Sequence, residues 1–164
     1  MQVTIDYYKK KIIIESSKEI KNSEEFGKML AKVPFEMKNH IPIFPVEING
    51  KKYMAGLDTG ANSNLAAKKI VEDIGKKTIK KYKEADINGV GGVAKDMQGI
   101  IPLVNFGGID YSKMRFAFED DTLVSFNNAY KANMDILLGY PFLKKYIATI
   151  DYANKEIRIY TGNK

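Results

Sequence analysis

Short apolar runs separated by polar residues, glycine and proline recur along most of the chain. This pattern predicts a protein built mainly of β-strands. One hairpin is predicted over residues 41–53, where Asn49-Gly50 separates two apolar runs and favours the positive φ angles of a two-residue turn. Another is predicted over residues 146–160, around Ala153-Asn154-Lys155.

Helical spacing appears in two places. Residues 65–74 predict a helix with Ser63 or Asn64 as its N-cap. Residues 22–33 predict another, because Asn22 and Glu25 form a capping box and Pro34 ends the apolar face. With two short strands expected over residues 3–8 and 12–14, residues 1–34 are predicted to form an N-terminal β/α extension that packs on the main domain, residues 35–164.

One acidic residue, Asp58, follows an apolar strand and enters a tight turn in the run Leu57-Asp58-Thr59-Gly60-Ala61. A carboxylate gains acid and base function most strongly from a second carboxylate close by, because the two then share a proton. Asp121-Thr122-Leu123 lacks the glycine and the preceding strand, so such a pair requires a second chain. The structural alternative is an aspartate that caps the following turn or helix.

Three motifs occur in order: Leu57-Asp58-Thr59-Gly60-Ala61, Ile87-Asn88-Gly89-Val90-Gly91-Gly92 and Ile136-Leu137-Leu138-Gly139. Together they resemble the retroviral-type, or retropepsin-like, aspartic proteases and their bacterial relatives with one motif per chain. The resemblance covers residues 35–160. It implies a mainly β, closed acid-protease barrel with one or two short helices.

The resemblance also implies roles for individual residues. Asp58 corresponds to the catalytic carboxylate, the Thr59 hydroxyl to a brace across the two-fold axis, and the Gly60 carbonyl to a contact with the substrate backbone. Ala61 and the run Gly89, Val90, Gly91 and Gly92, which resembles a flap tip, are the implied substrate-binding residues. No metal or cofactor is expected.

The expected function is that of an aspartic endopeptidase, with an Asp dyad formed across a homodimer and one activated water. The alternative is a catalytically inactive peptide-binding or regulatory module that stays monomeric. Asn62 and Tyr140 keep this alternative open, because many retroviral members have an acid and an arginine at these positions, paired near the dimer interface.

Composition excludes several other classes of enzyme and binding protein. The chain has no cysteine, which excludes disulfides and thiolate chemistry, and one histidine, His40, which leaves no Ser-His-Asp pattern. The net charge of +6 comes from scattered lysines with two arginines, so we expect a solvated basic surface and no nucleic-acid partner. No membrane-spanning run or signal peptide is expected in this sequence. Export to the periplasm or the extracellular space would require a signal outside it.

Overall fold

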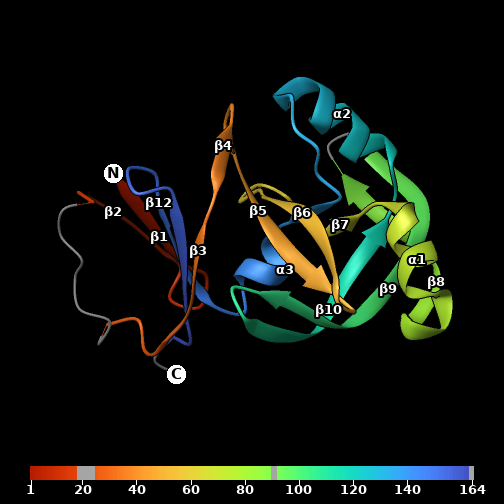
Figure 1. Cartoon of the computed structure of the whole chain (residues 1–164), viewed down its shortest axis with the longest axis horizontal. Coiled ribbons are helices and arrows are strands. Elements are labelled where there is room, and N and C mark those ends of the chain that lie inside the picture. The colour runs from red at the N-terminus through yellow and green to blue at the C-terminus, as the bar shows by residue number, and fades with distance from the viewer. Residues whose placement is uncertain (18–24, 90–91, 163–164) are drawn as a thin grey trace.

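Two sheets account for most of the computed structural model, which describes residues 1–17, 25–89 and 92–162 (Figure 1). The first, here called the terminal sheet, has five strands and contains strands from both ends of the chain. Its order is β2 (Lys11–Glu15), β1 (Gln2–Asp6), β12 (Ile147–Asp151), β13 (Glu156–Tyr160) and β3 (Met29–Pro34).

The second sheet has eight strands and is here called the barrel sheet. Its order is β4 (Glu36–Lys38), β5 (Ile41–Ile48), β6 (Lys51–Leu57), β11 (Ile136–Leu138), β7 (Leu65–Ala66), β10 (Ile109–Phe118), β9 (Gly92–Phe106) and β8 (Lys80–Gly89). Because β5 also pairs with β9, through Glu47 and Asn105, the strands from β5 to β9 in this order close on themselves. The mainly β fold expected from the sequence is therefore observed.

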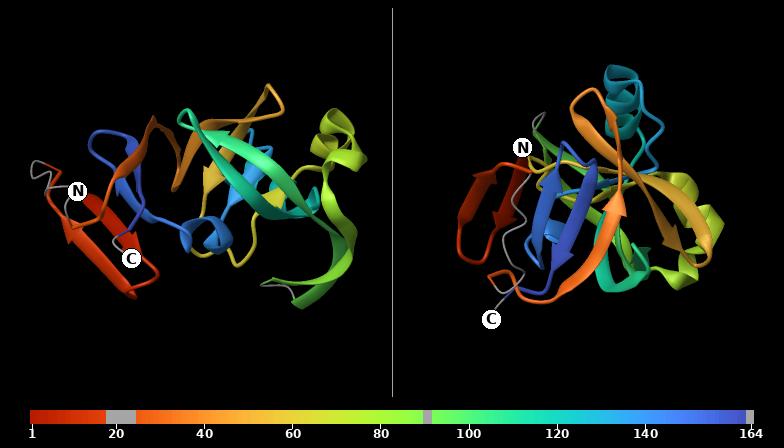
Figure 2. Two further views of the ribbon diagram at one scale, coloured as in Figure 1. Left: turned by 90° about the horizontal axis from the view of Figure 1, so that it is seen from below. Right: turned by 60° about the vertical axis from the view of Figure 1, so that its left-hand side comes forward.

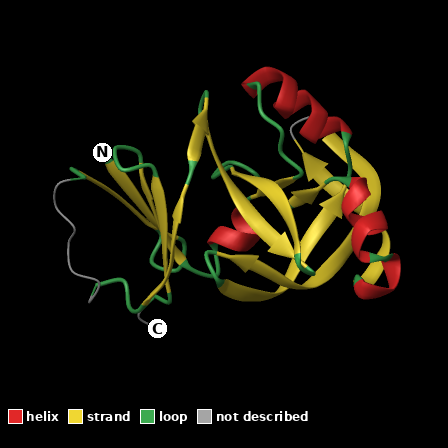
Figure 3. Cartoon of the chain, in the orientation of Figure 1, coloured by secondary structure: helices red, strands yellow, loops and turns green. Residues whose placement is uncertain are grey.

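Three α-helices occur in the described residues: α1 (Lys68–Ile74), α2 (Asp121–Tyr130) and α3 (Tyr140–Leu143). A 3₁₀ helix, Lys76–Thr78, follows α1. The first two α-helices lie on the side of the barrel remote from the terminal sheet, whereas α3 lies between the two sheets (Figure 3). No helix of the described residues is long and apolar enough to cross a membrane.

Both predicted hairpins are confirmed. Asn49 and Gly50 connect β5 to β6 with φ angles of 52° and 77°, as a two-residue turn between twisted strands requires. Residues 152–155 connect β12 to β13, and Ile150, Ile157 and Ile159 are buried. These three isoleucines share one core cluster with barrel residues such as Phe44 and Phe106, so the two sheets are packed together.

The helix predicted over residues 22–33 is wrong for the residues of this range that the structure describes, 25–33. Met29–Pro34 is strand β3, in which Ala31 and Val33 are buried while Lys32 between them is exposed. The alternation has period two, and the strand pairs with β13, more than 120 residues away along the chain. Tertiary pairing thus overrides the local helical spacing. Asn22 of the proposed capping box lies outside the described residues.

Within residues 1–34, the described part, 1–17 and 25–34, contributes three strands to a sheet completed by β12 and β13. Ala31 and Val33 from this part of the chain belong to the same core cluster as the barrel residues. The extension expected to pack on the main domain therefore shares its core, and the division of the chain after Pro34 stays a prediction.

The helix predicted over residues 65–74 begins later, at Lys68, because Leu65–Ala66 forms strand β7 between β11 and β10. Its N-cap is Ala67, without a side-chain cap, so neither Ser63 nor Asn64 has the predicted role. Helix α2 was not predicted from the sequence.

Candidate active site

Strand β6 delivers Asp58 to the candidate site. It runs parallel to β11, with Leu57 opposite Leu138, and the Asp58 amide continues the pairing by donating to the Leu138 carbonyl at 2.9 Å. Gly56 lies one residue before the end of the strand, where a Cβ atom would collide with the sulfur of Met134 and lie 3.0 Å from Ile41. A glycine here lets the strand end pack closely on its neighbours.

Residues 58–61 form a turn that we call the Asp58 loop. The Gly60 amide donates to Oδ1 of Asp58 at 2.8 Å, and the Ala61 amide donates to the Asp58 carbonyl at 3.3 Å. The Asp58 side chain is half-buried, whereas Thr59 and Gly60 at the tip are exposed. The loop thus fixes the direction of one carboxylate and presents its tip outward.

Asn64 lies three residues after this loop and is only 2% exposed. Its side-chain oxygen accepts from the Gly139 amide at 2.9 Å, and its side-chain amide donates to the Arg115 carbonyl at 3.0 Å. The residue therefore joins Gly139, which follows β11, to strand β10. Sequence reasoning assigned Asn64 to helix capping and missed this role.

Gly139 lies where the Asp58 loop contacts the start of α3. A Cβ atom on Gly139 would lie 2.5 Å from the Ala61 carbonyl oxygen and 2.8 Å from that of Ser63. The next residue, Tyr140, donates its amide to the same Ala61 carbonyl at 2.8 Å. Close backbone packing with the third sequence motif thus holds the end of the loop.

Tyr7, which follows β1, contacts the same loop from the terminal sheet. Its hydroxyl donates to the Thr59 carbonyl at 3.3 Å, and its ring meets the Tyr140 ring edge to face, with centroids 5.1 Å apart. Burial, Tyr140 and the Asp58 charge, in that order, raise the pKa of Tyr7 above its ordinary value. Because Tyr7 lies 52 residues from Thr59 and in none of the three motifs, sequence reasoning could not detect this contact.

The glycine-rich motif lies at the end of the β8–β9 hairpin, where Gly89 pairs with Gly92. This hairpin projects from the barrel (Figure 2). Val90 and Gly91 lie outside the described residues. The structure therefore brings Asp58, Thr59, Gly60 and Ala61 into one loop and places Gly89 and Gly92 at the end of a separate hairpin.

The described part of the chain contains no group of three or more His, Cys, Asp or Glu side chains arranged to hold a metal ion. In the Asp58 loop, the structure shows one carboxylate that accepts a hydrogen bond from one backbone amide, that of Gly60.

The family profile described as Aspartyl protease matches residues 44–142, which include the Asp58 loop and Gly139. The chain belongs to the aspartyl protease family. The Asp58 loop therefore belongs to a hydrolase of the aspartic protease type. A search of curated protein sequences gave no match.

Three solved structures are similar to this aspartyl protease family member. A retropepsin-like aspartic protease from Rickettsia conorii superposes with a TM-score of 0.52 at 15% identity, covering 80% of this chain and 93% of that one. The EIAV protease with the inhibitor HBY-793 gives 0.46 at 19% identity, covering 65% and 88%. The retroviral protease-like domain of Ddi1 from Leishmania major gives 0.47 at 19% identity, covering 79% and 89%. The Rickettsia structure confirms the retropepsin-like fold.

Proposed function

We propose that this chain is an aspartic endopeptidase that acts as a homodimer, with one Asp58 from each subunit. The observation that carries the proposal is the Asp58 loop itself. It presents one half-buried carboxylate with an exposed tip, in a family member whose sequence contains no second Asp-Thr-Gly run. The exposed tip, Thr59 and Gly60, is the part of the loop that a second copy can reach.

In the proposed mechanism, two Asp58 carboxylates share one proton and hold one water between them. The ionised carboxylate takes a proton from the water, which attacks the scissile carbonyl, while the protonated carboxyl donates to the carbonyl oxygen. This gives a neutral tetrahedral diol. The carboxyl that took the proton from the water then donates it to the leaving nitrogen, and the other carboxylate takes a proton from the diol as the carbon–nitrogen bond breaks.

The other residues in this proposal serve binding and alignment. The Thr59 hydroxyl braces the two loops across the two-fold axis, the Gly60 carbonyl and Ala61 contact the peptide backbone, and the hairpin that carries Gly89 and Gly92 closes over the substrate. An extended peptide suits this arrangement, because main-chain pairing can hold it between the loop and the hairpin.

The decisive experiment measures cleavage of a mixed peptide library between about pH 3 and pH 7, where carboxylates titrate. The native chain is compared with Asp58→Asn and with Asp121→Asn, a control at the exposed acid of the other Asp-Thr dipeptide. We expect cleavage by the native chain and by the control, and none by Asp58→Asn. Light scattering on the same samples should show that activity follows the dimer fraction.

A mixing experiment tests whether each site needs two Asp58 carboxylates. When native and Asp58→Asn chains are combined and allowed to exchange subunits, activity should follow the square of the native fraction. A linear dependence would exclude a shared dyad. A native chain that remains monomeric and cleaves nothing would instead support the inactive peptide-binding or regulatory module.

A further inference from the structure

A single peptide group links Tyr7 to Asp58. The carbonyl of Thr59 and the amide of Gly60 belong to the same planar peptide unit. The Tyr7 hydroxyl donates to that carbonyl at 3.3 Å, and that amide donates to Oδ1 of Asp58 at 2.8 Å. The tyrosine and the aspartate therefore hold opposite edges of one rigid plane.

We propose that Tyr7 is a positioning residue for the candidate catalytic carboxylate, and that it acts through the Thr59–Gly60 peptide plane. This inference rests on the proposed protease function for its effect on catalysis. The structural part, that Tyr7 fixes the orientation of the plane, holds for the folded chain with or without activity.

Tyr7 is well placed for this role because its own position is fixed. Strand β1 ends at Asp6, which is paired with Ile147 of β12 and with Lys11 of β2. The Asp6 carboxylate accepts from the Lys9 amide at 2.9 Å and so fixes the turn that contains Tyr7. The half-buried Tyr7 ring packs against the main core cluster. A donor anchored in the terminal sheet thus reaches the Asp58 loop.

The same side chain also contacts the residue that holds the far end of the loop. Tyr7 meets the ring of Tyr140, whose amide donates to the Ala61 carbonyl at 2.8 Å. The ammonium of Lys144 lies 5.1 Å from the centre of the Tyr140 ring and covers it. In the position where many retroviral proteases have half of a charge pair, this chain has a tyrosine that packs against its own N-terminal segment.

The loop needs such support because its tip is exposed and contains a glycine. Catalytic groups have to be held within about 0.5 Å of the productive geometry, and surrounding hydrogen bonds provide this. Hydrogen bonds in series also polarise one another, so a donor at the Thr59 carbonyl strengthens the Gly60 amide as a donor to Asp58. Losing the hydroxyl should loosen the plane and weaken that donor.

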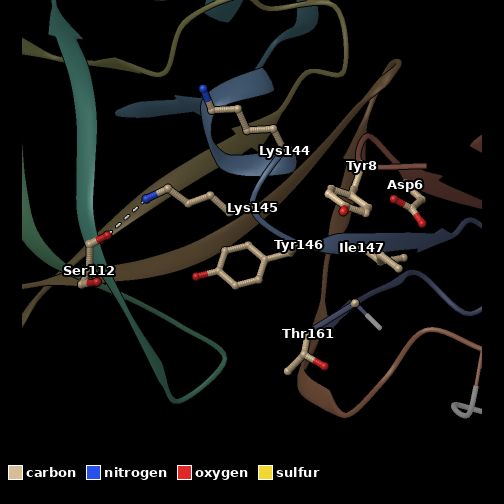
Figure 4. A pocket seen from close by; sticks show the side chains of 9 residues that line it. Asp6, Tyr8, Ser112, Lys144, Lys145, Tyr146, Ile147 and Thr161 are labelled. Carbon is tan, nitrogen blue, oxygen red and sulfur yellow. Dashed lines mark hydrogen bonds between the residues drawn. The ribbon is translucent and has the colours of Figure 1, made fainter. Parts of the chain in front are cut away.

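Tyr8 provides a matched control. It is the next residue, is 80% exposed, and lines a different hollow of about 660 Å³ beside Lys144, Lys145 and Ser112 (Figure 4). Tyr7 instead lines a hollow of about 450 Å³ together with Thr59. Tyr7→Phe and Tyr8→Phe each remove one hydroxyl and keep the ring, so only the first removes the contact with the loop.

The test has two readouts. Nuclear magnetic resonance follows the chemical shift and solvent exchange of the Gly60 amide proton, which reports its bond to Asp58 without requiring activity. Peptide cleavage rates, measured over a range of substrate concentrations and divided by the concentration of folded dimer, give kcat and KM separately. For Tyr7→Phe we expect faster exchange of the Gly60 amide and a kcat lower by about three- to tenfold, the range for one hydrogen bond, with KM within about twofold. Tyr8→Phe should match the native chain in both.

Each outcome decides a separate question. An unchanged Gly60 amide in Tyr7→Phe overturns the inference, whether or not the native chain cleaves peptides. A changed amide with kcat and KM both unchanged overturns the catalytic part. If the native chain cleaves nothing, the proposed function fails, while the resonance measurement still decides whether Tyr7 fixes the peptide plane.

Discussion

Replacing Asn64 with alanine should destabilise the fold strongly, although the residue lies in a connecting segment. The side chain is 2% exposed and satisfies two backbone groups, the Gly139 amide and the Arg115 carbonyl. Alanine leaves both without this partner. An unsatisfied buried polar group such as the Gly139 amide costs about 1–3 kcal/mol, and the part-buried Arg115 carbonyl adds a smaller cost, so we expect a total loss of about 3 kcal/mol.

For a chain of this size, about 3 kcal/mol corresponds to a fall in Tm of about 6–12 °C. The assay is thermal and urea unfolding followed by circular dichroism. Asn62→Ala is the control, because Asn62 is an exposed asparagine two residues away, and its Tm should stay within about 2 °C of the native value.

Asn64→Asp separates the two hydrogen bonds. The carboxylate keeps the acceptor for the Gly139 amide but places a second oxygen against the Arg115 carbonyl. We expect a Tm below the native value at neutral pH, with partial recovery in acid, where the protonated carboxyl can donate. If the free energy of unfolding of Asn64→Ala lies within about 0.5 kcal/mol of the native value, the assignment of Asn64 as the link between Gly139 and strand β10 is refuted.

Two further predictions concern the loop and the terminal sheet. Gly139 has a φ of −124°, which alanine can adopt, so Gly139→Ala should act only through contact of its Cβ atom with the Ala61 and Ser63 carbonyls, which displaces the Asp58 loop. We expect the free energy of unfolding to fall by about 1–3 kcal/mol and kcat to decrease. Wild-type values in both assays would contradict this packing. For Asp151, burial opposes ionisation, but hydrogen bonds from Ser17, Asn154 and the Ala153 amide outweigh it and lower the pKa. The unfolded chain therefore binds more protons in acid, and the stability that Asp151 contributes is present above about pH 4 and is lost as the pH falls through the lower folded-state pKa. Asp151→Asn should be less stable than the native chain at neutral pH and show a shallower decline below about pH 4 in urea unfolding, whereas parallel curves would rule out this titration.

Local chemistry explains why parts of the fold could be predicted. Asn49-Gly50 specifies its turn whatever surrounds it, because few residues accept positive φ angles. Residues 29–34 show the opposite case, because the spacing of Met29, Leu30 and Val33 satisfies a helix as well as a strand. Only pairing with β13 decides between them.

Helix α2 escaped prediction for a related reason. Asn127 suggests a loop when only its neighbours in the sequence are considered. In the fold, its side chain exchanges hydrogen bonds with the backbone of Met134, at 2.7 Å and 2.9 Å, and this stabilises the end of the helix. Buried Leu123 and the half-buried Phe126 pack the same helix against the barrel.

The residues of the candidate site also fall into those that could be predicted from the sequence and those that could not. The Asp58 loop and Gly139 could be located because their motifs are local and ordered along the chain. Asn64 and Tyr7 could not, because their roles depend on partners that are distant along the chain: Gly139 lies 75 residues from Asn64, and Thr59 lies 52 residues from Tyr7. A hydrogen bond from a side chain to a distant backbone carbonyl produces no regular spacing of residues along the sequence, so sequence reasoning cannot detect it.

The terminal sheet has a consequence for synthesis of the protein. Strand β1 pairs with β12, and the hydroxyls of Thr4 and Thr149 lie 2.7 Å apart although 145 residues separate them. Closing so long a loop is slow, and it cannot begin until the later strand has left the ribosome. The nascent chain therefore displays Asp58 well before Tyr7 is anchored. We expect the Asp58 loop to reach its final form late in the folding of this domain, only after residues 147–151 have emerged and β12 has paired with β1.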